Sequence, residues 1–417
     1  MRSNPEIKSG LTRRAAIGGA AAASATAVLS ACSNAKINAA RRIVIVGGGI
    51  VGASIAYYLA KGGAAITLIE RHELATRASR GTFAWLNATW AKQPQDYHRL
   101  NQMGMAGWKE IEADLGLPIK WSGSIEWFAD EERQDLLAEQ TAEQVTWGEP
   151  ARMVGREELD RMEPKVDFGG ATIAALSPND GALDPVLATR MLVESAVGNG
   201  AEVLTNCEVT DVREGDGAVL ETSCGPIECD RFVLATGADP LATQSLAGIG
   251  IPQRSTPGVI AITAPMEPVI DTMIVAPGVH IHQRLDGRVV LGEQDGAPQT
   301  EAHAARLAGR PNGFPTKELA QEHAGRIIAI AEHFVPALAE ATIEDVYIGW
   351  RPLPLDGHPV IGASPAVPSA YIAIAHSGVT LAPIIGKLAA QELLTGRASE
   401  LLVDYRPTRS FEEVRRY

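Results

Sequence analysis

The most chemically informative residues near the start of the chain are three glycines and one acid. Gly47 can make a tight turn, Gly49 lets a pyrophosphate approach the backbone, and Gly52 lets a following helix pack closely on the preceding strand. Glu70 follows at the distance at which an acid accepts hydrogen bonds from a ribose. Glu70 disfavours a ribose 2′-phosphate, although the neighbouring Arg71 weakens that argument. The pattern predicts a dinucleotide-binding site.

The segments around these glycines have the order strand, turn, helix, strand. Residues 43–46 are four β-branched residues in a row, which indicates a strand buried on both faces. Residues 53–61 are typical of a helix, and residues 65–69 of a second strand that ends at Glu70. The helix N-terminus would then present free N–H groups to a phosphate. A glycine-rich turn without a ligand is the alternative, which this context disfavours.

Two later turns and one loop have compositions that suit contact with a flat ligand. Residues 78–88 combine small residues and hydroxyl groups with one large aromatic, Trp85; a core-packed Trp85 in an ordinary loop is the alternative. Residues 231–234 form a predicted strand that ends in the small turn 235–237, where a parallel sheet would approach its ligand again. The turn 376–380 precedes a predicted last helix that extends to about residue 394.

Three histidines are candidates for chemistry. His280 and His282 share one face of a predicted strand and could line a pocket; a metal pair is the alternative, which we discount because no third ligand is visible nearby. His376 stands beside the last turn, where a structural role is at least as well supported as a catalytic one. We predict no metal site.

The first 40 residues are predicted to be an export signal and tether. An arginine pair at 13–14 precedes an apolar stretch that is too short and too mildly hydrophobic to span a membrane comfortably, which resembles a twin-arginine signal. Residues 29–32 resemble a lipobox that ends at Cys32; an ordinary peptidase site and a disordered alanine-rich leader are the alternatives. We therefore expect an exported, periplasmic protein, anchored to the membrane only through a lipid on Cys32.

The net charge and the cysteine content indicate which partners and which disulfides to expect. The net charge is −13, and cleavage before Cys32 removes four basic residues and one acidic residue, which lowers it to −16. This sign disfavours nucleic acid and anionic membrane surfaces as partners. Cys207, Cys224 and Cys229 remain, an odd number that forms no disulfide framework. Cys224 and Cys229 could pair across a hairpin, or the thiols could be free and buried.

The rest of the chain alternates predicted helices and strands. Asp184 is a predicted helix cap with Pro185 at the first helical position, and Pro383 is predicted in the first turn of the last helix. Short strands at 202–205, 209–213, 218–222 and 225–229 suggest one antiparallel meander. Further helices are predicted at 97–115, 131–146, 185–198 and 317–332, and further strands at 121–128, 260–263, 280–284, 288–291 and 370–375.

Together these motifs resemble the D-amino-acid oxidase superfamily of FAD-dependent amine oxidoreductases over roughly residues 42–400. The resemblance is carried by the glycine turn with Glu70 and by the segments 79–82, 181–185, 235–237, 350–357 and 376–378. It implies an α/β (α+β) fold, with a Rossmann-like FAD-binding domain and an inserted mixed-sheet substrate domain. We place the FAD-binding domain at 41–90, 165–250 and 345–405, and the substrate domain at 91–164 and 251–344.

The resemblance also assigns residues to FAD. The pyrophosphate would lie on the first helix, and Val209 would lie near the adenine. Backbone N–H groups at the start of the last helix would face the pyrimidine end of the flavin, where a helix N-terminus stabilises negative charge. The predicted cofactor residues are Gly47, Gly49, Ile50, Val51, Gly52, Glu70, Arg71, Ser79, Gly81, Thr82, Val209, Ala235, Thr236, Gly237, Arg351, Gly378, Val379 and Thr380. Some members attach the flavin to a cysteine where this chain has Gly349, so we predict non-covalent FAD.

The resemblance implies oxidation of the C–N bond of an amino acid or N-alkyl amino acid by hydride transfer to the flavin. Arg351 would bind the substrate carboxylate with its guanidinium fork, and a structural ion pair is the alternative. His376 and His282 complete the predicted catalytic set, and no general base is strictly required. The electron acceptor would be a quinone, a carrier or oxygen. A 2-hydroxy-acid or polyol dehydrogenase on the same fold, or a non-catalytic flavin-fold protein, are the alternatives.

Overall fold

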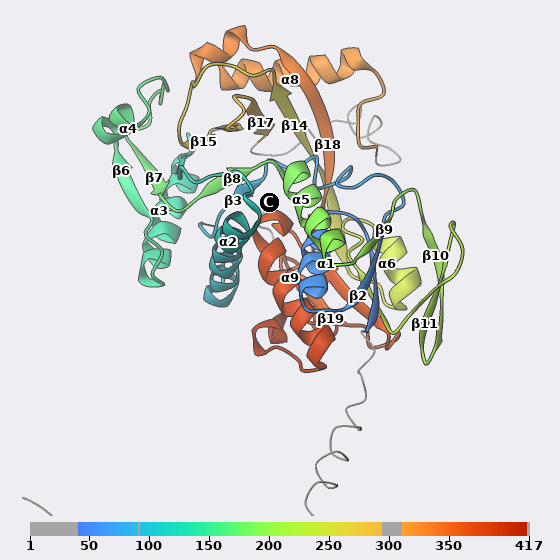
Figure 1. Cartoon of the computed structure of the whole chain (residues 1–417). Coiled ribbons are helices and arrows are strands. Elements are labelled where there is room, and N and C mark those ends of the chain that lie inside the picture. The colour runs from blue at the N-terminus through green and yellow to red at the C-terminus, as the bar shows by residue number, and fades with distance from the viewer. Residues whose placement is uncertain (1–40, 91, 294–310, 415–417) are drawn as a thin grey trace, which may run out of the picture. The chain divides into compact units, whose positions relative to one another are not determined.

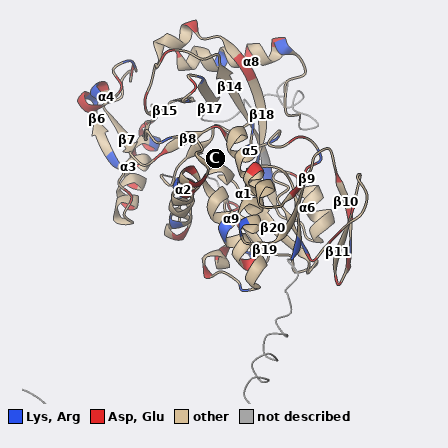
Figure 2. Ribbon diagram, in the orientation of Figure 1, with Lys and Arg blue, Asp and Glu red and all other residues tan. Residues whose placement is uncertain are grey.

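The computed structural model describes residues 41–90, 92–293 and 311–414, which form one compact unit. The predicted export signal, including Cys32, lies outside these residues. None of the helices in the described ranges combines the length and the hydropathy that a membrane span needs. On the exposed helices α4 (Arg156–Met162) and α8 (Lys317–Ala331), acidic and basic residues are mixed rather than separated by sign (Figure 2).

A six-stranded sheet carries the glycine turn. Its strand order is β19-β20-β13-β1-β2-β9, and all neighbours are parallel except β19 and β20. Helix α1 (Ile50–Lys61) packs against α5 (Pro185–Gly198) and α9 (Gly378–Thr395), and α9 packs against α2 (Gln95–Leu115) (Figure 1). The strands are β1 (Arg42–Val46), β2 (Ala65–Ile69), β9 (Glu202–Leu204), β13 (Arg231–Leu234), β19 (Val360–Ala363) and β20 (Ala370–Ile374).

An eight-stranded mixed sheet forms the second layer, in the order β18-β14-β17-β16-β15-β5-β7-β6. Residues on one of its faces form an apolar core with α8, which Figure 1 shows lying over β14, β17 and β18. The opposite face carries the polar residues discussed below. The strands are β5 (Ser124–Glu126), β6 (Arg152–Gly155), β7 (Ile173–Ser177), β14 (Gln253–Thr263), β15 (Met273–Ala276), β16 (Val279–Gln283), β17 (Val289–Glu293) and β18 (Ile343–Pro354).

The smaller elements connect these two sheets. A three-stranded sheet pairs β3 (Trp85–Leu86) and β4 (Ile119–Lys120) with β8 (Gly181–Leu183). Helix α3 (Glu131–Thr146) packs on β6, and α6 (Pro240–Ala247) packs on β13 and β20. Two 3-10 helices, Pro336–Glu340 and Glu400–Tyr405, complete the fold.

The predicted meander is correct for three of its four strands. β10 (Val209–Gly215), β11 (Gly217–Thr222) and β12 (Ile227–Cys229) are antiparallel neighbours. The first predicted strand instead pairs in parallel with β2, because it follows the crossover helix α5.

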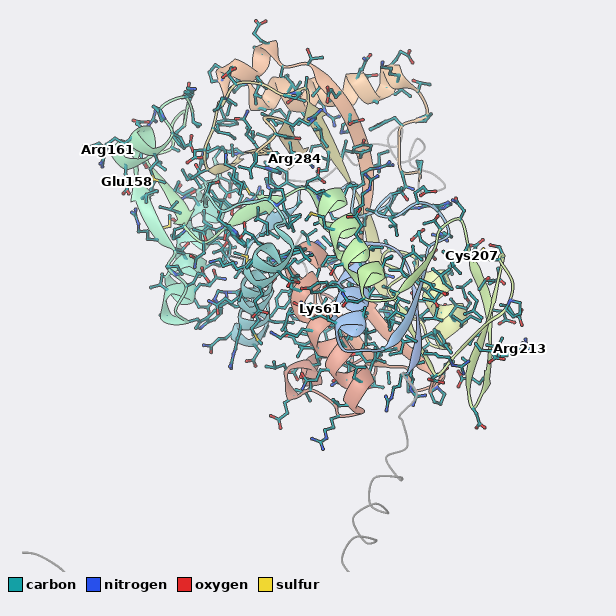
Figure 3. The ribbon with its side chains drawn as sticks, viewed as in Figure 1. Lys61, Glu158, Arg161, Cys207, Arg213 and Arg284 are labelled. Carbon is teal, nitrogen blue, oxygen red and sulfur yellow. A yellow bond between two sulfur atoms is a disulfide. The ribbon has the colours of Figure 1, made fainter. Side chains whose placement is uncertain are left out.

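Neither alternative given for the cysteines describes all three of them. Cys207 and Cys224 form a disulfide with Cα atoms 5.7 Å apart, and Cys229 is free and buried. Figure 3 labels Cys207 beside β10 and β11. The loop before β10 turns back to meet the β11–β12 turn, and that contact has no sequence signal.

Most predicted helices are present at the predicted residues. Asp184 caps α5 by accepting a hydrogen bond from Val186 N at 2.8 Å, and Thr316 caps α8. Pro383 lies inside α9 rather than in its first turn. Strands β7 and β18, which the predicted boundaries assign to the FAD-binding domain, belong to the eight-stranded sheet.

Candidate active site

The carboxyl ends of three parallel strands bring the glycine turn, Glu70 and the 235–237 turn together. Val46 is in register with Ile69 on β2 and with Leu234 on β13, so the residues that follow them are neighbours. Gly47 has a φ of +115°, and a Cβ atom there would lie 2.4 Å from the Ala235 carbonyl oxygen. A Cβ on Gly52 would lie 2.0 Å from the Gly47 oxygen. Side chains at either position would separate helix and strand.

The acid at the end of β2 is held by backbone donors. Glu70 Oε2 accepts a hydrogen bond from Gly48 N at 2.8 Å, and Oε1 accepts one from His72 N at 2.9 Å. The charge of the adjacent Arg71 is engaged by Asp239 at 2.9 Å and by Glu208 at 3.8 Å. Because two carboxylates already pair with the Arg71 guanidinium, Arg71 is a poor partner for a ribose 2′-phosphate. Glu70 therefore still favours a ribose without that phosphate.

The loop after β2 wraps around the start of α1. Ser79 Oγ accepts a hydrogen bond from Ile50 N at 3.0 Å. Two residues further on, the backbone of Gly81 touches the backbone of Gly349 on β18. A Cβ on Gly349 would lie 2.0 Å from the Gly81 oxygen, so no side chain fits there. The position at which some family members carry a flavin-linked cysteine is therefore sterically closed in this chain.

The N-terminus of α9 is fixed by contacts with β3 and with α2. Thr380 Oγ1 donates to the Trp85 carbonyl at 3.1 Å, and Trp108 Nε1 donates to the Val379 carbonyl at 2.8 Å. The N-cap residue Ser377 has a φ of +55° and makes no side-chain cap. Lys92 Nζ instead donates to Ser377 Oγ at 2.6 Å, which adds positive charge to the positive end of the helix dipole.

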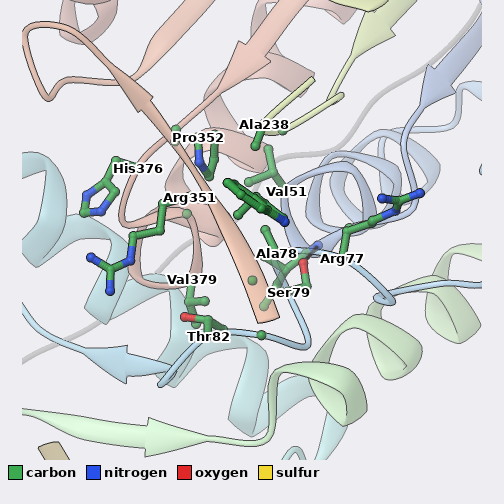
Figure 4. Close-up of a pocket in the computed structure, with 18 of the residues that line it drawn as sticks. Val51, Arg77, Ala78, Ser79, Thr82, Ala238, Arg351, Pro352, His376 and Val379 are labelled. Carbon is green, nitrogen blue, oxygen red and sulfur yellow. Dashed lines mark hydrogen bonds between the residues drawn. The ribbon is translucent and has the colours of Figure 1, made fainter. Parts of the chain in front are cut away.

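One elongated cavity of about 810 Å³ joins these features, and its volume is in the range of small-molecule and cofactor sites. Its wall runs from Glu70 and Val209 to Arg351 and His280. Figure 4 shows Arg351 and His376 at one end of this pocket and Arg77 toward the other. Among the predicted site residues, those that line it are Gly47, Gly49, Ile50, Val51, Glu70, Arg71, Ser79, Gly81, Thr82, Val209, Ala235, Thr236, Gly237, Arg351, His376, Gly378, Val379 and Thr380.

Two predicted site residues do not line the cavity. Gly52 lies behind the glycine turn, where its contribution is close packing. His282 Nε2 is 3.0 Å from the Phe83 carbonyl oxygen, and its ring stacks edge-on against the Phe83 ring. The prediction of His282 as a catalytic residue therefore needs correction. His280, two residues earlier on the same strand face, lines the cavity instead.

The histidines at the cavity are neutral. Burial, followed by the charge of Arg351, lowers the pKa of His280 to about 3. Burial, followed by the charges of Lys92 and Arg351, lowers the pKa of His376 to about 3. The cationic groups at this end are therefore Arg351 and Lys92, and both imidazoles are uncharged at neutral pH.

The side chain of Arg351 packs against the backbone of the neighbouring strand at a glycine. It is half-buried on β18, and a Cβ on Gly258 of the neighbouring strand would lie 3.2 Å from its Nε and Nη2 atoms. The absence of a side chain at Gly258 thus leaves room for the guanidinium against the backbone. Sequence reasoning did not identify Gly258.

Three further polar residues near the cavity were missed. Lys92 and Glu126 line it and are 6% and 7% exposed, and Asp180 is fully buried behind Trp85. For Glu126 a signal existed, because an acid between Ile125 and Trp127 is unusual in an apolar strand. Nothing in the local pattern identifies Lys92.

This cavity suits a long ligand with an anionic centre and a flat ring. Helices α1 and α9 both begin at the cavity, and at neither N-terminus does the N-cap side chain accept a hydrogen bond from the backbone. Such termini bind anionic groups. Among the described residues, no group of His, Cys, Asp and Glu could hold a metal ion.

Comparisons with known proteins agree with this geometry. The chain is 28% identical over 374 residues to 4-methylaminobutanoate oxidase (formaldehyde-forming) of Paenarthrobacter nicotinovorans, an alignment that covers 85% of this chain but only 44% of that enzyme. It is 25% identical to the glycine oxidase of Geobacillus kaustophilus (strain HTA426), with 84% of this chain and 91% of that enzyme covered.

A solved structure and a family match complete the comparison. The crystal structure of L-proline dehydrogenase from P. horikoshii superposes with a TM-score of 0.76 at 26% identity and covers 88% of this chain and 97% of that one. Residues 42–392 match the family described as FAD dependent oxidoreductase (DAO). The chain therefore belongs to the DAO family of FAD-dependent oxidoreductases, and its cofactor is FAD.

Proposed function

We propose that this enzyme oxidises the C–N bond of an amino acid or an N-alkyl amino acid. The observation that carries the proposal is Arg351, a half-buried guanidinium on β18 that lines the cavity and whose charge acts on two neutral histidines. A guanidinium in this setting matches a substrate carboxylate with two parallel hydrogen bonds. Relatives named for 4-methylaminobutanoate and glycine oxidation support the substrate class.

The residues of the chain bind and orient, and bound FAD supplies the acceptor for the hydride. Arg351 fixes the carboxylate and so places the neighbouring carbon. The positive charges of Arg351 and Lys92 lower the pKa of a bound amine, which favours the neutral form that is ready for oxidation. Trp85 and Phe83 line the cavity and exclude water. The neutral imidazoles of His280 and His376 add no charge that opposes iminium formation.

We also propose that the enzyme is exported by the twin-arginine route and anchored through Cys32, with electrons passed to a quinone or carrier. The arginine pair in the leader supports export. The Cys207–Cys224 disulfide supports an oxidising compartment. Fractionation of cells that express the full chain and a Cys32→Ser variant tests this proposal. Recovery of both proteins in the cytoplasm would refute export, and equal recovery in the soluble periplasm would refute the anchor.

The central experiment is anaerobic absorbance spectroscopy of the purified enzyme. Bleaching of the flavin by D-, L- or N-methyl amino acids is expected. Failure of every amine, combined with bleaching by a 2-hydroxy acid, would replace this proposal with a hydroxy-acid dehydrogenase.

A further inference from the structure

The Cys207–Cys224 disulfide lies at one end of the cavity. Cys207 is part of the cavity wall there, and Glu208 and Val209, which follow it in the chain, line the wall as well. Glu70 lines the same end, which is predicted to hold the adenosine of FAD. The function proposed above gives the position of this bond at the cavity no role.

The backbone around Cys207 is hydrogen-bonded to the backbone around Glu70. Cys207 N donates to the Glu70 carbonyl at 3.0 Å, and Glu70 N donates to the Leu204 carbonyl at 2.8 Å. Next to these bonds, Asn206 N donates to the His72 carbonyl at 3.0 Å. The position of Glu70, whose carboxylate is predicted to bind the ribose, therefore depends on the segment that ends at Cys207.

This segment leads directly into β10, an edge strand of the three-stranded meander. β10 pairs with β11, and most of its residues are exposed. Segments with few buried contacts open locally at a lower free energy than the core does. A link between the start of β10 and the rest of the meander therefore restricts how far Cys207 and the backbone bonded to it can move.

The disulfide is such a link. It joins Cys207, just before β10, to Cys224 in the turn between β11 and β12, across a sequence separation of 17. Cys207 is fully buried in an apolar cluster with Ile69 and Leu220, whereas Cys224 is exposed. The bond thus connects a buried residue at the cavity wall to a surface turn that a thiol reagent can reach.

Hydrogen bonds join the same loop and turn in addition to the disulfide. Glu208 N donates to Ser223 Oγ at 2.9 Å, and Ser223 N donates to the Glu208 carbonyl at 2.9 Å. Because these bonds remain after reduction, the meander should stay folded without the disulfide. A cross-link that closes a loop lowers the entropy of the open states, so its loss should raise the population of locally open protein.

We propose that the Cys207–Cys224 disulfide slows the release of FAD by holding the backbone of Glu70 in place, so that Cys207 is a positioning residue for the cofactor. Formation of the bond releases two protons and passes two electrons to a thiol–disulfide oxidant, whose own disulfide becomes two thiols. An exported enzyme could thus take up FAD while both thiols are reduced and retain it after the bond has formed. This inference depends on FAD as the cofactor and is independent of which substrate is oxidised.

The rate of FAD release from the purified holoenzyme measures the effect of the bond. The fluorescence of free FAD is followed after dilution of oxidised and of reduced holoenzyme. Dithiothreitol gives Cys207 and Cys224 two electrons and two protons and becomes a cyclic disulfide, and oxidised glutathione restores the bond. The reduced holoenzyme is expected to release FAD about 10-fold faster than the oxidised one, and reoxidation should restore the slow rate.

Two cysteine variants separate the effect of the bond from that of the reagent. Cys224→Ser removes the bond by changing an exposed residue, so it should release FAD at the rate of the reduced wild type, with or without dithiothreitol. Cys229→Ala removes a buried free thiol and keeps the disulfide, so it should respond to dithiothreitol as the wild type does.

Hydrogen exchange of the holoenzyme distinguishes a local effect from a general loss of stability. Reduction should accelerate the exchange of backbone amides at 204–210 and 70–72 and leave β14 and β18 of the eight-stranded sheet unchanged. With FAD at saturation, kcat and KM should change less than about twofold, because Arg351 and the start of α9 lie away from the disulfide.

Two results would overturn this inference. One is a rate of FAD release that neither dithiothreitol nor Cys224→Ser changes, and the other is faster hydrogen exchange spread over both sheets. Either result would leave the proposed amine oxidation intact. Conversely, failure of every amine to bleach the flavin would overturn the proposed function, whereas the FAD release rates would still decide whether the disulfide retains the cofactor.

Discussion

Replacement of Arg351 by methionine tests the proposed carboxylate site directly. Methionine keeps an unbranched apolar stem but removes the guanidinium. Loss of one partner from a hydrogen-bonded charge pair costs about 2–5 kcal/mol, and because Arg351 is half-buried rather than fully enclosed, the lower part of that range applies. A loss of about 2–3 kcal/mol corresponds to a decrease in kcat/KM of roughly 30- to 150-fold.

The decrease should appear mainly in KM. The carboxylate does not change during oxidation, so Arg351 stabilises the bound substrate and the transition state alike, and kcat should fall less than about threefold. The assay is dye-coupled turnover with the best amino acid from the substrate panel, together with its analogue that lacks the carboxylate. The analogue should respond equally to wild type and variant.

The control is Arg288→Met, which removes a half-buried arginine paired with Asp286 and Glu344 at 3.1 and 3.0 Å. It should leave both kinetic constants unchanged. If Arg351→Met kept kcat/KM within threefold, or if the analogue lost as much activity as the carboxylated substrate, the assignment of Arg351 would be wrong.

Further changes test the surroundings of the cofactor and substrate. FAD should stay in the supernatant after acid precipitation, because Gly349 has no room for a side chain that could attach it; a yellow pellet would contradict this. Gly47→Ala should yield protein with little bound FAD, since its Cβ would lie 2.4 Å from the Ala235 oxygen. A normal flavin content would show that FAD binding does not depend on this turn. Gly258→Ala should raise KM several-fold with FAD retained, as the guanidinium of Arg351 must shift by a few tenths of an ångström; unchanged KM would refute this positioning effect. Burial lowers the pKa of His282 to about 3, so between about pH 3 and pH 6.5 the unfolded state binds more protons than the folded state. The free energy of unfolding should therefore decrease as the pH is lowered through this window, by about 1.4 kcal/mol per pH unit for each such histidine. Denaturant melts of His282→Asn should show a shallower slope, and an identical slope would exclude this contribution.

The sequence was sufficient for the cofactor half of the cavity because that half depends on local patterns. A buried strand, a glycine turn and a helix are consecutive in the chain, and parallel register then brings Glu70 and Ala235 to the same edge. The caps at Asp184 and Thr316 are equally local, and both helices begin where predicted. Patterns within about 30 residues therefore determined this part of the fold.

The substrate half was harder to predict because it depends on the register between distant strands. His280 and His282 have the same sequence signal, and only the packing of Phe83 over the sheet distinguishes the one that lines the cavity. The disulfide between Cys207 and Cys224 likewise depends on two loops that approach each other around the meander. The spacing of the residues in the sequence therefore indicates neither which histidine lines the cavity nor which cysteines form the disulfide.

Under the proposed function, the two sheets divide recognition of cofactor and substrate between them. Parallel strands end in turns and helix N-termini, which suit an anionic cofactor and leave little scope for variation. The mixed sheet presents every second residue to the cavity, so one substitution on β5, β16 or β18 changes the charge or shape met by the substrate while its neighbours stay in the core. Glu126, His280 and Arg351 occupy three such positions on one face. Substrate choice in this enzyme should thus change by exchange of these side chains, whereas the glycine turn and the start of α9 should tolerate almost no exchange without loss of FAD.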